Sequence, residues 1–320
     1  MFRRLRHVLA VLVAVGLSAT AVPAAASAAP RNPAAARSVA AASVGSAAVA
    51  ALRNGNSNTE TVYLVHGIKD PTKARNAAFY DCASLWSNAE WTLRNAGWHG
   101  GFRTFGYYGK DSHCDKRVNG TVDSRIQWVG LQLAWDIYNN YSRHGKSVDI
   151  LAHSMGGLVA RAAITGVQKH AKTKWGKFPP YLYVEDAVTL STPFTGTNWA
   201  TTCLAVNGWE QCSDMRPGSG FLKWCNQNPQ AKGGTDWTLI GSSDDDIVTS
   251  GSATCMNAGH KVIYAAHQGL EHMDMIFKWN GSFTLRYINY TDRKVRWYTT
   301  TRQGPPVAWG YKSLYYSSGW

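Results

Sequence analysis

Long apolar runs, basic clusters and glycine-rich phosphate loops are all missing from this chain of 320 residues. The longest apolar stretch, from Val8 to Leu17, is well short of the ~18 to 20 residues that a membrane-spanning helix needs, and no later segment qualifies. We therefore expect no integral membrane segment in the mature protein. The net charge of +13 is not gathered in a Lys/Arg block, so it indicates a solubilising surface and no nucleic-acid partner.

Acidic residues are missing from the first 59 positions, which instead begin as an export signal does. Arg3, Arg4 and Arg6 precede the apolar run, and Ala26-Ser27-Ala28 offers a cleavage site, so residues 1–28 are expected to be a bacterial-type secretory signal peptide. Residues 29–58 are rich in Ala and Ser and predict a solvated linker or pro-segment. We expect residues 59–320 to form one catalytic domain of a secreted, extracellular protein.

Metal-ligand spacings are missing too, because the chain has no C-x-x-C motif and no paired His–Cys spacing, and we expect no metal. Six cysteines lie beyond the signal, and an even number in an exported chain predicts three disulfides. Sequence alone leaves their connectivity open. We favour pairs of sequence neighbours because each closes a short loop: Cys82–Cys114, Cys203–Cys212 and Cys225–Cys255.

Apolar, β-rich runs alternate with helix-like stretches along most of the chain. The alternation predicts a largely parallel central sheet with helices on both faces, an α/β fold. One helix is marked by apolar residues at three- and four-residue steps from Ile126 to Ile137, with Asp123 or Ser124 as its cap. The expected strands are Thr61–Val65, Phe102–Tyr108, Val148–Ala152, Ala187–Leu190, Thr238–Ile240 and Val262–Ala266.

Ser154 lies in a very short turn between the strand that ends at Ala152 and a helix that begins at Gly156. A sharp strand–turn–helix needs very small residues two before and two after the serine, and Ala152 and Gly156 meet that need. The turn exposes the hydroxyl and aims the N–H groups of the helix start at whatever the serine attacks. Ser154 is therefore our candidate nucleophile, whereas a helix-capping serine is the structural alternative.

A nucleophilic serine needs a base and an acid at the same edge of the sheet. After the strand Thr238–Ile240, the chain supplies Asp244, Asp245 and Asp246. We choose Asp245, because the following Ile247 and Val248 must turn back into the core, and we interpret the other two as solvated loop acids.

The base is expected to follow the last parallel strand. His260 precedes that strand and belongs at the opposite edge, while His267 and His272 follow it. We choose His272, which sits on a glycine-containing loop before an apolar helical stretch, over His267. His66 and His153 are interpreted as neighbours that stabilise turns.

A cradle for the negative oxygen is also required when serine attacks a carbonyl. The strand Thr61–Val65 ends in His66-Gly67-Ile68, where Gly67 lets the backbone turn closely. We expect the backbone N–H groups of Ile68 and Met155 to hold the oxyanion.

Together these motifs resemble the α/β-hydrolase fold, specifically secreted bacterial lipases and esterases whose nucleophile elbow is Ala-x-Ser-x-Gly. The matching residues are Ala152-His-Ser154-Met-Gly156, the oxyanion loop His66-Gly67-Ile68, and the segment Thr189-Leu-Ser-Thr-Pro193-Phe-Thr-Gly196. The resemblance covers approximately Thr59 to Trp279. It implies a triad of Ser154, Asp245 and His272, with Ile68 and Met155 as backbone donors and no cofactor.

Two segments depart from this family pattern. Residues 198–236 form a loop-rich, cysteine-containing insertion that we expect to be a fixed wall rather than a mobile lid, with a surface decoration as the alternative. Residues 281–320 form an aromatic, β-rich extension. Its Phe283–Tyr290 and Val295–Tyr298 segments predict a hairpin, and its later aromatics are expected to pack onto the body rather than grip a lipid or polymer surface.

The sequence thus predicts a secreted serine hydrolase that cleaves carboxylic esters through an acyl-enzyme. An acyltransferase could use the same residues, and a non-catalytic protein that binds lipid or polymer could keep the same fold. The ester itself stays open, because triglycerides, short-chain esters and polyester surfaces present the same carbonyl group.

Overall fold

The computed structural model describes residues 56–69, 77–171, 177–289 and 296–316. The expected signal peptide over residues 1–28, and the expected linker over 29–58 apart from its last three residues, lie outside the described residues. No helix in the described ranges combines the length and the apolar character that crossing a bilayer requires.

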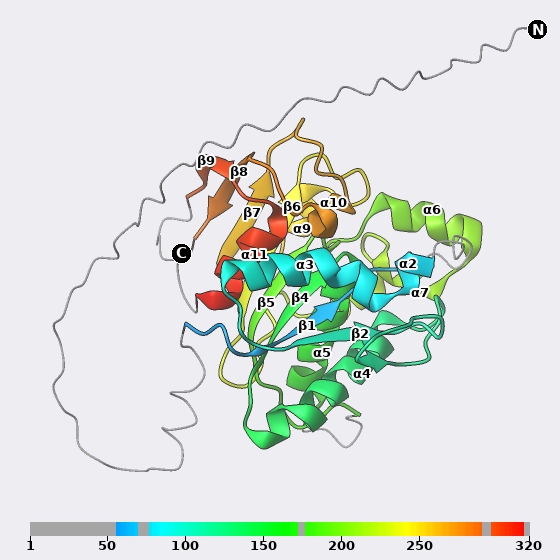
Figure 1. The fold of residues 1–320 in the computed structure, drawn as a ribbon. Helices are drawn as coiled ribbons and strands as arrows, with labels where there is room; N and C mark the ends of the chain where they lie inside the picture. The colour runs from blue at the N-terminus through cyan, green and yellow to red at the C-terminus, as the bar shows by residue number, and fades with distance from the viewer. Residues whose placement is uncertain (1–55, 70–76, 172–176, 290–295, 317–320) are drawn as a thin grey trace, which may run out of the picture. The chain divides into compact units, whose positions relative to one another are not determined.

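One sheet of nine strands organises the described residues, with the strand order β3-β2-β1-β4-β5-β6-β7-β8-β9 (Figure 1). The pairings from β3 through to β7 are parallel, and β8 and β9 are antiparallel additions at one edge. The mostly parallel sheet predicted from the sequence is confirmed. Its strands are β1 Thr61–Val65, β2 Phe102–Gly106, β3 Lys116–Arg117, β4 Val148–His153, β5 Val184–Leu190, β6 Asp236–Ser242, β7 His260–Tyr264, β8 Phe283–Ile288 and β9 Tyr298–Gln303.

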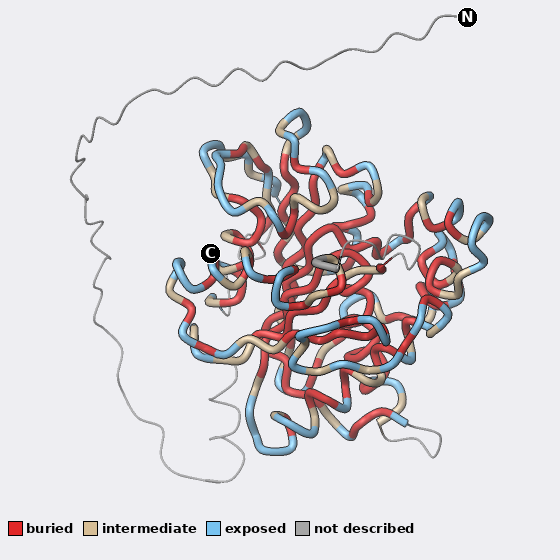
Figure 2. Tube along the Cα trace, turned by 45° about the vertical axis from the view of Figure 1, so that its right-hand side comes forward, coloured by how far each residue is buried: buried red, intermediate tan, exposed pale blue. Residues whose placement is uncertain are grey.

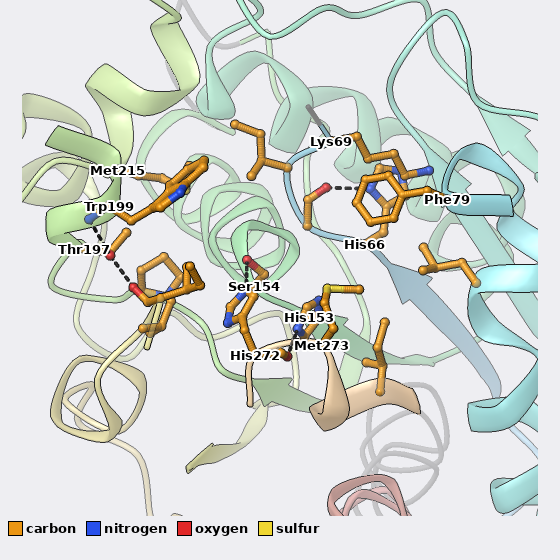
Figure 3. A pocket seen from close by; sticks show the side chains of 17 residues that line it. His66, Lys69, Phe79, His153, Ser154, Thr197, Trp199, Met215, His272 and Met273 are labelled. Carbon is orange, nitrogen blue, oxygen red and sulfur yellow. Dashed lines mark hydrogen bonds between the residues drawn. The ribbon is translucent and has the colours of Figure 1, made fainter. Parts of the chain in front are cut away.

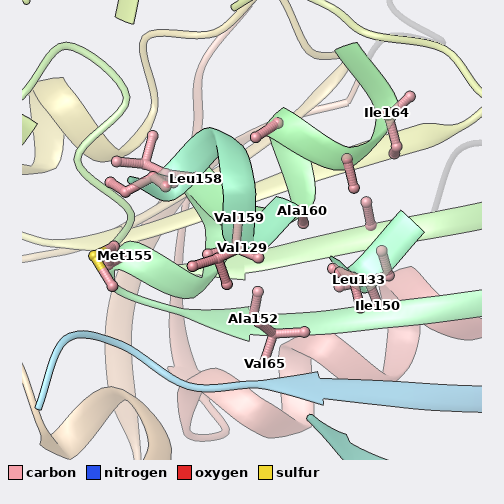
Figure 4. Packing of buried hydrophobic residues seen from close by; sticks show 14 of the residues in the cluster. Val65, Val129, Leu133, Ile150, Ala152, Met155, Leu158, Val159, Ala160 and Ile164 are labelled. Atoms are coloured by element: carbon pink, nitrogen blue, oxygen red, sulfur yellow. The ribbon is translucent and has the colours of Figure 1, made fainter. Parts of the chain in front are cut away.

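Helices cover both faces of the sheet because successive strand residues point to opposite sides. In β1, Tyr63 and Val65 join one buried cluster, whereas Val62 and Leu64 join the other. The first cluster lies under α4 Ile126–Asn140 and α5 Met155–His170, whose apolar side chains pack against β1 and β4 (Figure 4). The second lies under α3 Cys82–Ala96 and α11 Pro306–Tyr315. Burial is concentrated along the sheet, and exposed residues gather in the connections (Figure 2).

The insertion at residues 198–236 is more helical than its sequence suggested. It contains α6 Asn198–Asn207, α7 Glu210–Met215 and α8 Gly220–Trp224. The start of α4 also depends on it, because the Ile126 N–H donates to Asp214 Oδ2 at 2.9 Å. The prediction that Asp123 or Ser124 caps α4 is therefore wrong: the N-cap position is Arg125, without a side-chain cap bond, and a carboxylate from a distant helix accepts instead.

The tail after residue 281 also differs from its prediction. Its first strand begins at Phe283 as the sequence predicted, and Tyr290 and Val295 of the two predicted segments lie outside the described residues. The second strand includes Tyr298 and continues to Gln303, and α11 follows. The tail is therefore not β-rich throughout. Trp309 of α11 is only 5% exposed and packs in the second cluster, as expected for aromatics that cover the body. The remaining helices are the short α2 Ala77–Tyr80, η2 Ser142–His144, α9 Ser250–Ala253 and α10 Asp274–Phe277.

Two of the three expected disulfides are present, Cys82–Cys114 and Cys203–Cys212. The third is wrong, because Cys225 and Cys255 are free thiols, one buried and one exposed. Nearness in sequence lowers the cost of closing a loop, but a bridge also needs two Cβ atoms that face each other. The Cys203–Cys212 disulfide therefore joins α6 to α7 within the insertion, and no disulfide joins Cys225 of the insertion to Cys255.

Acidic side chains gather at the edge of the sheet where the strands begin. Asp149 and Asp186 are 1% and 4% exposed, and the Asp186 N–H donates to Asp149 Oδ1 at 3.1 Å. Asp149 Oδ2 has no hydrogen-bond partner among the described residues. Burial, together with the charges of Glu60 and Glu185, raises the pKa of Asp149 well above its usual value. Ionisation of this cluster therefore opposes folding.

We predict that Asp149→Asn stabilises the protein more at pH 8 than at pH 4. The pKa of Asp149 is raised in the folded state, so its cost is absent below the unfolded pKa of about 4 and grows as the pH rises above it. Asparagine keeps the Oδ1 acceptor but carries no charge. Melting temperatures at the two pH values measure the effect. The exposed Asp123→Asn is the control and should show no such difference, and an equal gain at both pH values for Asp149→Asn would contradict the prediction.

Candidate active site

Ser154 occupies the single residue between β4 and α5, with φ 55° and ψ −131°. Such a backbone costs about 1–3 kcal/mol for a residue other than glycine and needs support from its surroundings. The Ser154 N–H donates to Leu190 O at 2.9 Å, and Thr192 Oγ1 donates to Ser154 O at 2.9 Å. The side chain makes no helix-capping bond, so the alternative of a capping serine does not describe it.

Two glycines make this elbow sterically feasible. A Cβ on Gly156 would lie 2.1 Å from Val65 O, so any larger residue would push α5 away from β1. A Cβ on Gly67 would lie 2.7 Å from Ser154 Cβ, so the loop after β1 approaches the serine as closely as glycine permits. The sequence suggested that a small residue is needed at position 156, and the structure gives the reason, because Gly156 lies directly against the backbone of β1.

His272 approaches Ser154 from the loop between β7 and α10. Its Nε2 lies 2.9 Å from Ser154 Oγ, and its Nδ1 lies 2.9 Å from Asp245 Oδ2. The structure thus brings together Ser154, His272 and Asp245, which lie far apart in the sequence, and neither bond involves His267. Figure 3 shows the His272 ring beside Ser154.

Asp245 is the carboxylate that faces the imidazole. Its Oδ1 also accepts the N–H groups of Ile247 and Val248, at 3.0 and 2.8 Å. Burial alone would raise the pKa of Asp245, but the hydrogen bonds from His272 and the backbone lower it below its usual value. The ionised carboxylate can only accept, so His272 Nδ1 carries the proton and Nε2 is left to accept from Ser154.

Asp244 is a partly exposed loop acid, but it has a structural role that the sequence did not suggest. Its carboxylate accepts four consecutive backbone N–H groups from residues 267–270, at 2.6, 2.7, 2.8 and 3.4 Å. Burial alone would raise the pKa of Asp244, but these N–H groups lower it. Asp244 therefore fixes the loop that leads to His272. Asp246, by contrast, is exposed, as expected.

His153 supports the same loop from the other side. Its Nε2 lies 2.9 Å from His272 O, and its ring is buried. Burial lowers the pKa of His153 to about 3, so the ring is neutral near pH 7 and donates this hydrogen bond. The sequence predicted a residue that stabilises a turn, and the turn in question is the one that carries His272.

The expected oxyanion donors lie on either side of Ser154. Met155 is the first residue of α5, where backbone N–H groups have no partner within the helix. Ile68 follows Gly67 and lines the cavity over Ser154. The role of the two N–H groups as oxyanion donors stays a prediction.

A cavity of about 210 Å³ opens over Ser154, and most of its lining is apolar (Figure 3). The insertion contributes Trp199 and Met215 to one wall, while α2 and α3 contribute Phe79 and Leu85 to another. Further apolar lining comes from Ile247, Val248, Met273 and Ile276. Within the described ranges, no three His, Cys, Asp or Glu side chains are placed to hold a metal ion.

The family match covers the part of the chain that carries the triad residues. Residues 139–279 match the model of the class 2 lipase family, which confirms the resemblance to bacterial lipases and esterases with an α/β-hydrolase fold. No curated protein matches the chain.

Solved structures are similar at low identity. Bacillus licheniformis lipase BlEst2 in its propeptide form is 16% identical, with a TM-score of 0.45 over 69% of this chain and 48% of that one. Phospholipase PlaB from Legionella pneumophila is 12% identical, with a TM-score of 0.47 over 81% and 60%. A lipase-esterase related protein from Clostridium acetobutylicum is 12% identical, with a TM-score of 0.41 over 70% and 93%. The chain thus spans about half the length of the first of these.

Removal of the Asp244 carboxylate should free the loop before His272. In Asp244→Ala, we expect amide hydrogen exchange at residues 267–270 to accelerate by about tenfold or more, because their shared acceptor is lost. The neighbouring, exposed Asp246→Ala should leave these rates unchanged. Equal exchange in wild type and Asp244→Ala, measured by NMR or mass spectrometry, would show that the loop is held by other contacts.

Proposed function

We propose that this protein, whose residues 139–279 match the model of the class 2 lipase family, hydrolyses carboxylic esters through an acyl-enzyme on Ser154. The observation that supports this most is the unbroken hydrogen-bonded chain from Ser154 through His272 to Asp245, at 2.9 Å for both links. The family match by itself does not show these three side chains in contact. Their meeting supplies a nucleophile, a base and an orienting acid in a single site.

In the proposed reaction, Ser154 Oγ attacks the ester carbonyl carbon while its proton moves to His272 Nε2. The tetrahedral oxyanion is held by the N–H groups of Ile68 and Met155. Collapse breaks the bond to the alcohol oxygen, which takes the proton from His272 and leaves. Water then attacks the acyl-enzyme with His272 as base, and the acid is released. Asp245 stays ionised throughout and stabilises the imidazolium. The chemistry needs no metal or organic cofactor.

The apolar cavity supports an acyl group as the part of the substrate that enters the protein. Its walls carry Trp199, Met215, Phe79 and other apolar side chains that would be desolvated by a hydrocarbon chain. We propose that the small volume of this cavity, about 210 Å³, favours short and medium acyl chains over long ones.

We also propose that the enzyme acts outside the cell as a single catalytic domain over residues 59–320. The two disulfides support export, because such bonds persist in oxidising compartments. The signal peptide and the linker remain predictions from the sequence.

Labelling with a fluorophosphonate probe tests the nucleophile. The folded wild type should be labelled and should hydrolyse p-nitrophenyl butyrate, while Ser154→Ala should lose both activities by about 10⁴-fold or more. Ser243→Ala, an exposed serine at the end of β6, should behave as wild type. Folded wild-type protein that neither reacts with the probe nor turns over any ester would refute the proposed function.

Replacement of Trp199 tests the proposed preference for chain length. Trp199→Ala enlarges the cavity, so the ratio of kcat/KM for octanoate to that for butyrate esters should rise by about tenfold. Val206→Ala lies in the same helix, but its side chain is 75% exposed, and it should leave the ratio unchanged. An unchanged ratio in Trp199→Ala would place the acyl chain elsewhere.

A further inference from the structure

A buried cluster that includes an ion pair holds both ends of residues 66–69. These residues, which are His66-Gly67-Ile68 with Lys69 added, are called the oxyanion loop from here on. Lys69 and Asp111 are each 1% exposed, and Lys69 Nζ lies 2.6 Å from Asp111 Oδ1. His66 Nε2 lies 3.0 Å from Asp111 Oδ2. None of these side chains has a role in the proposed reaction. Buried charges are costly to desolvate, so their presence next to the nucleophile requires a physical explanation.

Asp111 belongs to a rigid part of the fold. It follows β2, and its Oδ2 also accepts the N–H groups of Tyr107 and Tyr108 at 2.8 and 2.9 Å. The Cys82–Cys114 disulfide ties this connection to α3. Arg117 Nη1 donates to Asp111 O at 3.1 Å. The carboxylate is therefore a fixed point to which neighbouring groups can be attached.

The oxyanion loop is attached to this fixed point through several bonds. Lys69 and His66 contact the carboxylate itself, from both ends of the Gly67-Ile68 pair. Tyr107 contributes a further contact, because its hydroxyl donates to the carbonyl oxygens of His66 and Gly67. Ile68 is thus held between two anchored residues, and Figure 3 shows His66 and Lys69 together on the side of the cavity opposite Trp199.

Electrostatics favour a charged Lys69–Asp111 pair, whereas burial lowers the pKa of His66. Burial alone would raise the pKa of Asp111, but His66 and Lys69 hold it well below its usual range. Burial lowers the pKa of Lys69, and the charge of Asp111 opposes that shift. The carboxylate is the anionic group that Lys69 contacts in the described residues. Removal of the carboxylate would leave a buried ammonium without its counter-ion, and the loop would have to move to hydrate it.

We propose that Asp111 is a positioning residue for the oxyanion hole, acting through Lys69 and His66 to fix the Ile68 N–H beside Ser154. The inference rests on the proposed function. The reason is the short distance between the loop and the nucleophile, since a Cβ on Gly67 would lie 2.7 Å from Ser154 Cβ. A small shift of the loop would therefore change the position of the Ile68 N–H relative to Ser154. Misplacement of a catalytic group by about 1 Å can cost about 100-fold in rate.

Asp111→Asn is the test, because it keeps the size of the side chain and removes its charge. We expect kcat for p-nitrophenyl butyrate to fall by about 100-fold while KM stays within about twofold. The inhibition constant of a phenylboronic acid, whose tetrahedral serine adduct places an oxygen in the hole, should rise by a similar factor. A loss of folded protein would lower the apparent kcat but would not weaken boronate binding to the folded fraction.

Asp136→Asn is the matched control. Asp136 is also buried and also contacts a cation and a tyrosine, Arg103 and Tyr63, but these partners do not belong to the oxyanion loop. It should lower the melting temperature without changing kcat or the boronate constant. An Asp111→Asn protein with both quantities within twofold of wild type would overturn the inference.

Lys69→Met keeps the test decisive if Asp111→Asn does not fold. It leaves the backbone bonds of Asp111 intact, and we expect kcat and boronate affinity each to fall by about tenfold. Unchanged boronate affinity in folded Lys69→Met would overturn the inference. Failure of the wild type to hydrolyse any ester is a different result, because it refutes the proposed function whatever the variants do.

Discussion

The parallel register of five neighbouring strands is the constraint on which the site depends. Because β1, β4, β6 and β7 run in the same direction, the segments that follow them meet at one edge of the sheet. The oxyanion loop, Ser154, Asp245 and His272 each come from one of these segments. Between β4 and β6 lies β5, whose last residue accepts the Ser154 N–H and so supports the strained turn. A slip of one residue in any pairing would turn these groups to the other face.

Two neighbouring carboxylates at this edge, Asp244 and Asp245, have different roles in the site. Asp245 faces the imidazole and accepts two N–H groups, whereas Asp244 accepts four N–H groups from the following loop and never reaches His272. Both stay ionised because the donors around them outweigh the cost of burial. Asp245 therefore sets the tautomer of His272, and Asp244 fixes the loop that positions His272.

The strands, the elbow and the identity of the three central residues could be predicted, because each depends on local pattern and on which edge of a parallel sheet a segment must occupy. Ala152-His-Ser154-Met-Gly156 encodes its own turn, and the position of His272 after β7 follows from strand direction. The structure brings these residues together, and experiment tests their catalytic roles.

The features that could not be predicted depend on contacts between distant segments. Asp214 satisfies the start of α4 from a helix 88 residues away, and nothing near Ile126 signals it. Likewise, loop length favoured a Cys225–Cys255 bridge, but both cysteines are free thiols in the structure.

Support for the site comes from backbone N–H groups and cations gathered around two carboxylates, one on each side of the nucleophile. Asp111 plays this part beneath the oxyanion loop, and Asp244 plays it beneath the loop that leads to His272. Both loops are short irregular segments, which by themselves would fluctuate by more than the tolerance of an oxyanion hole or a proton transfer. A carboxylate is suited to holding such a loop, since two oxygens accept several N–H groups at once and each bond to a charged acceptor is stronger than a neutral one. The cost of desolvating these two carboxylates is thus offset because each holds one loop in place. These loops, the oxyanion loop and the loop that leads to His272, are where the proposed chemistry tolerates the least motion.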